Sequence, residues 1–384
     1  MKKFVGFAIA AIAMVAMFTG CAKKEASAEK VIKIGVFEPL TGANAAGGAL
    51  EIEGVRLAHT LFPTVTINGE EYKVELTIAD NKSDKVEAAN AVQRLIDKDK
   101  VHFILGSWGS GFSIAAGEIV RQAEVPAMGL SCTNPLVTAG NDYYFRTCFI
   151  DPFQGTVMAN YASREAGAKT AAIVREVSND YSVGLAKFFV DRFTELGGSI
   201  VAEVDYNTGD QDFSAQLTTI KDMNPDVIFA PGNYTESALI AKQARELGIT
   251  VPFLGGDTWE TPELITVGRE NVEGVVFSSF FDETAATDGI AKLFVDEYRK
   301  MYGADKEIAA VSALGFDGYR VALDAIARAN STDTKVIRDA VAATKDFDGA
   351  TGKITFDANG DATKDAYIKT VENGKFKFLT IVEP

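Results

Sequence analysis

The sequence predicts an α/β protein built from two doubly wound parallel-sheet domains. Short apolar runs rich in Val and Ile alternate with stretches whose apolar residues recur every three or four positions, which is typical of strands alternating with helices. This alternation occurs twice, over residues 31–129 and again over residues 170–255. The length of 384 residues also favours two domains over one, since a domain usually has about 100 to 200 residues.

The expected strands are short and apolar, as in a sheet that helices cover on both faces. In order, they span residues 31–37, 74–79, 101–105, 126–130, 170–174, 200–206, 227–231 and 252–255. Apolar spacing predicts helices over residues 84–97, 112–123, 182–196 and 235–247, then over 286–302, 309–330 and 333–344. Residues 143–149 are expected to cross between the domains, and the tail around 357–360 is expected to form a hairpin turn.

Residues 1–25 have the pattern of an export signal that ends in a lipid-attachment cysteine. Lys2 and Lys3 precede an apolar stretch from Phe4 to Phe18, which is short for a bilayer span of roughly 20 residues. Gly20 before Cys21 fits a bacterial lipobox, although Phe18 stands where leucine is usual. We therefore expect a signal peptide at 1–20, a lipid on Cys21 and a tether linker at 21–30. A plain secretory signal and an uncleaved anchor are the alternatives.

The chain is acidic, with a formal net charge of −15. Such a surface would repel nucleic acid and anionic lipid, so neither is an expected partner, and we expect a monomer. Apart from Cys21, the cysteines are Cys132 and Cys148, which could form a disulfide or remain two buried thiols. His59 and His102 lie in different units without metal-ligand spacing, so neither a metal, a cofactor nor a catalytic triad is expected.

Small and polar residues follow the predicted strands, where doubly wound sheets bind their ligands. A glycine such as Gly109 lets the backbone approach a ligand, and the helix that follows would direct free amides at an anion such as an α-carboxylate. The hydroxyls of Ser110 and Thr133 could donate to that anion, and Asp257 could pair with an amine. The candidate ligand-binding residues are Trp108, Gly109, Ser110, Ser131, Thr133, Tyr181, Asn233, Tyr234 and Asp257. A structural role is the alternative for each, because Gly and Ser are common in such loops and acids often cap helices.

With these residues in place, the chain resembles the periplasmic-binding-protein type I receptors for branched-chain amino acids. Four segments carry the resemblance: VHFILGSWGSGFSIAAGEIVRQAEVPAMGLSCTNP, AAIVREVSNDYSVGLA, PDVIFAPGNYTESALIAKQARELG and VPFLGGDTWETPEL. It extends over nearly the whole chain that follows the export signal. It implies two lobes joined by a multi-strand hinge, formed by residues 31–148 plus 281–350 and by residues 149–280 plus 351–384, with the ligand in the cleft between them.

The resemblance also implies roles for single residues. The ligand carboxylate would meet backbone amides and hydroxyls at Ser110, Ser131 and Thr133, and its ammonium would meet Asp257 as well as Thr133. One family tyrosine matches Tyr181. A second falls at Asn233 or, with a one-residue slip, at Tyr234.

The side-chain pocket departs from the family pattern. The region of Gly47 and Gly48 stands where the receptors place a tyrosine, and Trp108 and Gly109 stand where they place leucine and a disulfide cysteine. Trp108 could fill space or offer its face to an aromatic ligand. A small or branched aliphatic amino acid is the favoured ligand.

We therefore expect an extracytoplasmic, lipid-anchored binding protein rather than an enzyme. It would capture an aliphatic amino acid by hinge closure and deliver it to the permease of an ABC importer. The alternatives are the same fold binding an amide, a urea-like compound or another small metabolite, and a sensor. A hydrolase on this scaffold is disfavoured, because Ser110 has no histidine close to it in sequence.

Overall fold

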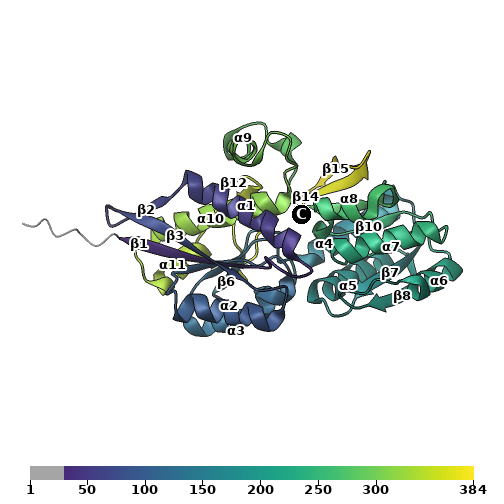
Figure 1. The fold of residues 1–384 in the computed structure, drawn as a ribbon, viewed down its shortest axis with the longest axis horizontal. Helices are drawn as coiled ribbons and strands as arrows, with labels where there is room; N and C mark the ends of the chain where they lie inside the picture. The colour runs from purple at the N-terminus through teal and green to yellow at the C-terminus, as the bar shows by residue number, and fades with distance from the viewer. Residues whose placement is uncertain (1–29) are drawn as a thin grey trace, which may run out of the picture.

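The computed structural model describes residues 30–384. The predicted signal peptide, Cys21 and almost all of the linker lie outside the described residues, so both the signal and the lipid remain predictions. Among residues 30–384, no helix is long and apolar enough to cross a membrane. The described chain forms two halves, each a sheet with helices packed on it, that lie side by side (Figure 1).

The first half is built on a six-stranded sheet with the order β2-β3-β1-β4-β5-β6. Its strands are β1 (Val31–Glu38), β2 (Thr64–Ile67), β3 (Glu70–Asp80), β4 (Phe103–Leu105), β5 (Ala127–Gly129) and β6 (Tyr144–Arg146). Neighbours are parallel except β2 and β3, which form an antiparallel pair at the edge. The structure differs from the prediction at β2, a short edge strand with alternating exposed and buried residues. It differs again at β6, which joins this sheet instead of only crossing between domains.

The second half carries a seven-stranded sheet with the order β15-β14-β11-β10-β9-β7-β8. Its strands are β7 (Thr170–Glu176), β8 (Ser199–Tyr206), β9 (Val227–Phe229), β10 (Phe253–Gly255), β11 (Val276–Ser279), β14 (Ala366–Glu372) and β15 (Lys375–Val382). The neighbouring strands β8 and β7, β7 and β9, β9 and β10, and β10 and β11 are parallel. Strand β14 pairs antiparallel with β11, and β15 pairs antiparallel with β14.

The C-terminal hairpin lies further along the chain than the sequence analysis predicts. Strands β14 and β15 are joined at Asn373 and Gly374, which both have positive φ angles, 56° and 68°. Two such residues suit the two-residue turn that matches strand twist, and Asn-Gly favours it. The turn at residues 357–360 is closed by a hydrogen bond from the Gly360 N–H to the Asp357 carbonyl at 3.1 Å, and its flanks pair through an isolated antiparallel bridge between Phe356 and Ala362 instead of longer strands.

Helices cover both sheets. In the first half they are α1 (Ala45–Leu61), α2 (Lys85–Asp97), α3 (Ser110–Ala123), α9 (Gly289–Tyr302), α10 (Ala310–Ala329) and α11 (Thr334–Ala342). In the second half they are α4 (Asp151–Asn160), α5 (Asp180–Glu195), α6 (Ser214–Met223), α7 (Tyr234–Glu246) and α8 (Pro262–Gly268). Figure 1 shows α1 and α10 on one face of the first sheet and α2 and α3 on the other. Parallel strands with helices on both faces confirm the predicted α/β fold class.

Helix α10 returns to the first half although it follows the second sheet in sequence, and it packs closely on α1. Glycines make this approach possible: a Cβ on Gly54 would lie 1.8 Å from the Ser312 carbonyl oxygen, and one on Gly315 would lie 2.3 Å from that of Glu51. The chain passes between the halves after β6, after β11 and between β13 (Gly352–Ile354) and β14.

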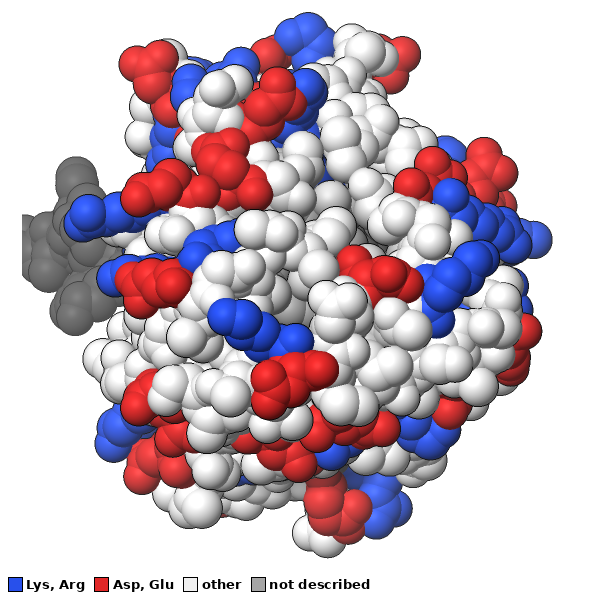
Figure 2. Space-filling model, turned by 90° about the vertical axis from the view of Figure 1, so that its right-hand side faces the viewer, with Lys and Arg blue, Asp and Glu red and all other residues white. Residues whose placement is uncertain are grey.

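The sequence left open whether the two cysteines pair, and the structure answers this. Cys132 and Cys148 are buried free thiols rather than a disulfide, and burial raises the pKa of Cys132 to about 11. Figure 2 shows acidic and basic side chains interspersed over the exposed end of the second half. This face offers no continuous basic surface for nucleic acid.

Candidate ligand-binding cleft

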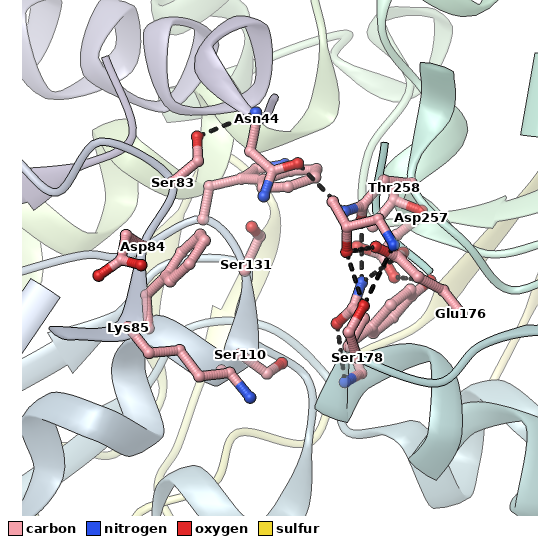
Figure 3. A pocket seen from close by; sticks show the side chains of 18 residues that line it. Asn44, Ser83, Asp84, Lys85, Ser110, Ser131, Glu176, Ser178, Asp257 and Thr258 are labelled. Atoms are coloured by element: carbon pink, nitrogen blue, oxygen red, sulfur yellow. Dashed lines mark hydrogen bonds between the residues drawn. The ribbon is translucent and has the colours of Figure 1, made fainter. Parts of the chain in front are cut away.

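A cavity of about 280 Å³ lies between the two halves and is lined from both. Pockets for small molecules usually measure roughly 300 to 1,000 Å³, so this one suits a small ligand. The first half lines it with Asn44, Ser83, Asp84, Lys85, Trp108, Gly109, Ser110, Gly111, Phe112 and Ser131. The second half lines it with Glu176, Ser178, Asn179, Tyr181, Thr208, Asn233, Asp257 and Thr258. Figure 3 shows Ser110 and Ser131 on the first-half wall, facing Asp257 and Glu176 across the cavity.

Ser110 lies at the N-terminus of α3, where it can serve an anion. Gly109, the residue before the helix, has a φ of 91°, a left-handed conformation that suits glycine. The Ser110 Oγ accepts a hydrogen bond from the Asn134 backbone N–H at 3.1 Å, so its own O–H remains free to donate. The start of α3 adds the backbone amides of Ser110 and Gly111 and the positive end of the helix dipole. This wall is therefore suited to a carboxylate.

Ser131 and Thr133 follow β5 but differ in their access to the cavity. Ser131 lines it, and its hydroxyl donates to the buried Glu51 carboxylate. Thr133 is fully buried and lies behind the wall. Its hydroxyl is beside the Asp151 carboxyl, whose pKa burial raises to about 8, but within the described chain it forms no well-aligned hydrogen bond. The structure thus brings Ser131 to the cavity and leaves Thr133 beneath it.

Asp257 is the acid at the opposite wall, directly after β10. The Gln154 amide donates to its Oδ1 at 2.7 Å and the Tyr181 hydroxyl donates to the same oxygen at 3.1 Å. Burial raises the Asp257 pKa to about 7, against these two hydrogen bonds, which lower it. A cation in the cavity would favour the ionised carboxylate. Tyr181 therefore lines the cavity and also orients the acid.

Trp108 and Tyr234 meet where the two halves touch. The Trp108 indole packs on α1 at Gly47, where a Cβ would lie only 2.4 Å from the ring. Its ring centroid is 5.8 Å from that of Tyr234, whose hydroxyl donates to the Ala43 carbonyl of the first half at 3.0 Å. Tyr234 is thus an interlobe contact and not part of the cavity lining. Its neighbour Asn233 lines the cavity. Of the two alternatives for the second family tyrosine, Asn233 therefore faces the cavity and Tyr234 lies between the halves.

Further contacts across the cleft close its mouth. Lys85 forms an ion pair with Asp180 at 2.6 Å, and the Asn134 amide donates to the Asp180 carbonyl at 2.8 Å. The Asn233 amide donates to the Asn44 side chain at 3.1 Å. Each of these pairs joins the first half to the second. The structure therefore shows the halves in contact around the cavity.

Several lining residues were missed by the sequence analysis. Glu176 is buried at the end of β7 and accepts hydrogen bonds from the Asn179 amide at 2.9 Å and from the Thr208 hydroxyl. Ser83 and Lys85 follow β3, so the rule that ligands meet strand ends could have found all three. Gln154 and Glu51, by contrast, sit inside helices and have no such signal. Among residues 30–384, no group of three or more metal-binding side chains is present.

Comparison with known proteins places this architecture in a family. A family model described as periplasmic binding protein matches residues 31–375. The leucine binding protein LivK from Thermotoga maritima is 45% identical with a TM-score of 0.88, over 92% of this chain and 99% of that one. LivJ from Streptococcus pneumoniae, solved with isoleucine, is 35% identical with a TM-score of 0.85, over 92% of this chain and 100% of that one.

A curated relative agrees with these structures. The Leu/Ile/Val-binding protein homolog 3 of Brucella melitensis is 29% identical over 345 residues, which are 88% of this chain and 90% of that protein. The likeness confirms the resemblance seen in the sequence. This chain belongs to the periplasmic binding protein family, whose members are solute-binding proteins, and its relatives are branched-chain amino-acid binding proteins of ABC transporters.

Proposed function

We propose that this chain binds an aliphatic amino acid of the leucine type in the cleft and delivers it to an ABC importer. The observation that carries the proposal is the pairing of an anion-suited wall at Ser110 with a buried acid, Asp257, across a cavity of about 280 Å³. Such a pair matches a zwitterion with an α-carboxylate at one end and an ammonium at the other. Relatives named for leucine and solved with isoleucine support an aliphatic side chain.

Binding would proceed by closure of two lobes, residues 31–148 plus 281–350 and residues 149–280 plus 351–384. A ligand held first at Ser110 would gain Asp257 and Tyr181 only in the closed form, and this differential contact shifts the equilibrium toward closure. No covalent step is needed, so the proposal assigns no enzymatic activity. A lipid on Cys21 and a short linker would keep the receptor outside the cytoplasm and near its permease.

The family resemblance implies that Ser131 binds the ligand carboxylate, but the hydrogen bond between Ser131 and Glu51 favours another role. Because its hydroxyl donates to Glu51, Ser131 offers only oxygen lone pairs to the cavity, and lone pairs accept from an ammonium. We therefore assign Ser110 and the α3 amides to the carboxylate, and Asp257 with Ser131 to the ammonium. Trp108 and Phe112 supply the apolar surface for the ligand side chain.

The test is a thermal-shift screen against the twenty amino acids and small amides, followed by calorimetric titration. At 100 times its dissociation constant, a ligand should add about 2.7 kcal/mol of stability. L-leucine should bind and N-acetyl-L-leucine should not, because the acetylated amine cannot pair with Asp257. Equal affinity for both compounds would contradict the zwitterion site.

A second candidate is a small polar metabolite. Away from Asp257 the cavity wall also carries polar side chains, among them Asn44, Ser83, Ser178, Asn179 and Thr208. An amide or urea-like ligand could use these groups without a free α-amine. The amides in the same screen test this candidate, which requires that one of them stabilise the protein more than leucine does.

Mass spectrometry of the mature amino terminus tests the lipid on Cys21.

A further inference from the structure

Two glutamates lie side by side in the core behind the ligand-facing wall of the first half. Glu38 is the last residue of β1 and Glu51 lies within α1, and both are fully buried. Neither lines the cavity, but each holds a segment that does. The Trp108 backbone N–H donates to Glu38 Oε2 at 2.7 Å, and the Ser131 hydroxyl donates to Glu51 Oε1.

The hydrogen bonds of this pair require a shared proton. Glu38 Oε2 accepts from Trp108 and from the Ser107 hydroxyl, while Glu51 Oε1 accepts from Ser131. The remaining oxygens, Glu38 Oε1 and Glu51 Oε2, are buried and have no hydrogen-bond donor among the described residues, and the two carboxyls are near enough for each to act on the charge of the other. An ionised carboxylate only accepts hydrogen bonds, so a proton on one carboxyl, donated to the other, is what would satisfy both oxygens.

The proton belongs on Glu38. Burial raises the pKa of both carboxyls, to about 7 for Glu51 and well above the usual range for Glu38. Two neighbouring carboxylates that are both fully buried cannot both stay ionised without water, as in other carboxyl pairs that share a proton. Above pH 7 the pair therefore keeps a single proton, which Glu38 donates to an ionised Glu51.

The groups that surround the pair do not neutralise a second charge. Those whose ionised forms interact with Glu38 or Glu51 are acids or weak acids: Cys132, Tyr144, Cys148 and Asp257. The cation beside them, Arg146, is fully buried and committed elsewhere. It donates to the Cys132 and Asn134 carbonyls and pairs with Asp361. Loss of the shared proton would thus leave two buried negative charges facing each other.

We propose that Glu38 and Glu51 are positioning residues for the ligand site, which share one proton and so hold the Trp108 and Ser131 segments at a fixed separation. It follows that amino-acid affinity falls when alkaline pH removes the proton, because repulsion drives β1 and α1 apart and takes both segments with them. The affinity part of the proposal rests on the proposed function. The fall would reach at most tenfold per pH unit for one proton.

The test compares wild type with Glu38→Gln. The amide oxygen of glutamine still accepts from the Trp108 N–H, and its NH2 group donates to Glu51. The variant therefore makes the hydrogen bonds of a protonated Glu38 but has no proton to lose at alkaline pH. Calorimetric titration with L-leucine from pH 7 to about 9.5 should show falling affinity in wild type and a flatter profile in Glu38→Gln. The two proteins should agree within about threefold at pH 7. Ionisation of leucine and of Asp257 affects both proteins alike and cancels in the comparison.

A control and a ligand-free readout keep the two proposals apart. Glu118→Gln removes an exposed carboxyl of α3 and should follow the wild-type profile. In a Trp259→Phe background, Trp108 is the sole tryptophan, and its emission without ligand should change between pH 7 and 9.5 unless Glu38→Gln is present. If leucine fails to bind at every pH, the proposed ligand is wrong, and this emission still decides on the pair. Parallel pH profiles of wild type and Glu38→Gln, in affinity or in emission, would overturn the shared proton.

Discussion

Replacing Asp257 by asparagine is the sharpest perturbation of the proposed site. Gln154 and Tyr181 both donate to Oδ1 of Asp257, and they would hold the asparagine carbonyl oxygen in the same place. The asparagine NH2 group would then take the position of Oδ2 and face the ligand ammonium, donor against donor. The variant therefore loses a buried charge pair and gains a repulsive contact.

Breaking a buried, hydrogen-bonded charge pair costs about 2 to 5 kcal/mol. This corresponds to a loss of affinity of about 30-fold to several thousandfold. The ligand-free protein should melt at an unchanged or slightly higher temperature, because both hydrogen bonds remain and a buried acid is removed. Calorimetric titration with L-leucine at pH 7.5 measures the first effect, and a melting curve without ligand measures the second.

A matched control is Asp222→Asn, the same change at an exposed residue of α6. It should bind leucine as the wild type does. An Asp257→Asn affinity within threefold of wild type would refute the reasoning and remove Asp257 from the ammonium site. A large drop in the ligand-free melting temperature would instead show that Asp257 supports the fold.

Three further predictions follow from contacts around the cleft. The pKa of Asp257 is about 7 without ligand, and a bound ammonium would lower it, so leucine affinity should rise with pH below 7 by up to tenfold per unit. Above pH 7 the contribution of Asp257 should be constant, so any further change there has another source. Titrations of Asp257→Asn should lack the rise below pH 7, and an equal rise would contradict the prediction. Gly47→Ala places a methyl group 2.4 Å from the Trp108 indole, so Trp108 must shift. Leucine affinity, measured by calorimetry, should fall at least about tenfold, and the free energy of unfolding, measured with denaturant, should fall by about 1 to 3 kcal/mol. Lys85→Ala removes the half-exposed ion pair between the halves, which contributes at most about 1 kcal/mol. The rate constant for leucine dissociation, measured by stopped flow, should therefore rise about two- to fivefold. A hundredfold rise would mean that Lys85 contacts the ligand.

The fold was predictable because its strands are buried on both faces and read as short apolar runs. The pattern failed to predict β11, a buried four-residue strand inside the second sheet, and two parts at the edges. Strand β2 is four residues long and half exposed, so its alternation is too brief to separate from a loop. The β14–β15 hairpin was predictable, because the dipeptide Asn373-Gly374 between two strand-like runs is a strong indication of a two-residue hairpin turn.

The candidate site was predictable where a side chain lies in the loop after a strand or at the start of the next helix. Trp108, Ser110, Ser131 and Asp257 lie two to five residues after β4, β5 or β10 and line the cavity. Thr133 lies four residues after β5 but is fully buried, so a position after a strand does not by itself bring a side chain to the cavity.

Supporting residues inside helices were not predictable in this way. Gln154 and Glu51 lie within α4 and α1, and helical spacing alone does not tell which loop a side chain reaches. The one available hint for Glu51 is that this acid sits among buried apolar residues such as Leu50 and Ile52. A buried acid in such a stripe needs a partner, but only the structure identifies Glu38 and Ser131 as that partner.

The orientation of the ligand follows from those hidden partners more than from the residues that touch it. A serine hydroxyl can donate or accept, so two serines at a cleft do not by themselves distinguish a carboxylate from an ammonium. The Ser110 hydroxyl accepts from the backbone N–H of Asn134 and is left with a donor, whereas the Ser131 hydroxyl donates to Glu51 and is left with acceptors. Asp257 has its Oδ1 occupied by donors and turns its other oxygen to the cavity. In the proposed site, the direction in which an amino acid lies would therefore be set largely one layer behind the cleft, by Asn134, Glu51 and Gln154, which do not line the cavity.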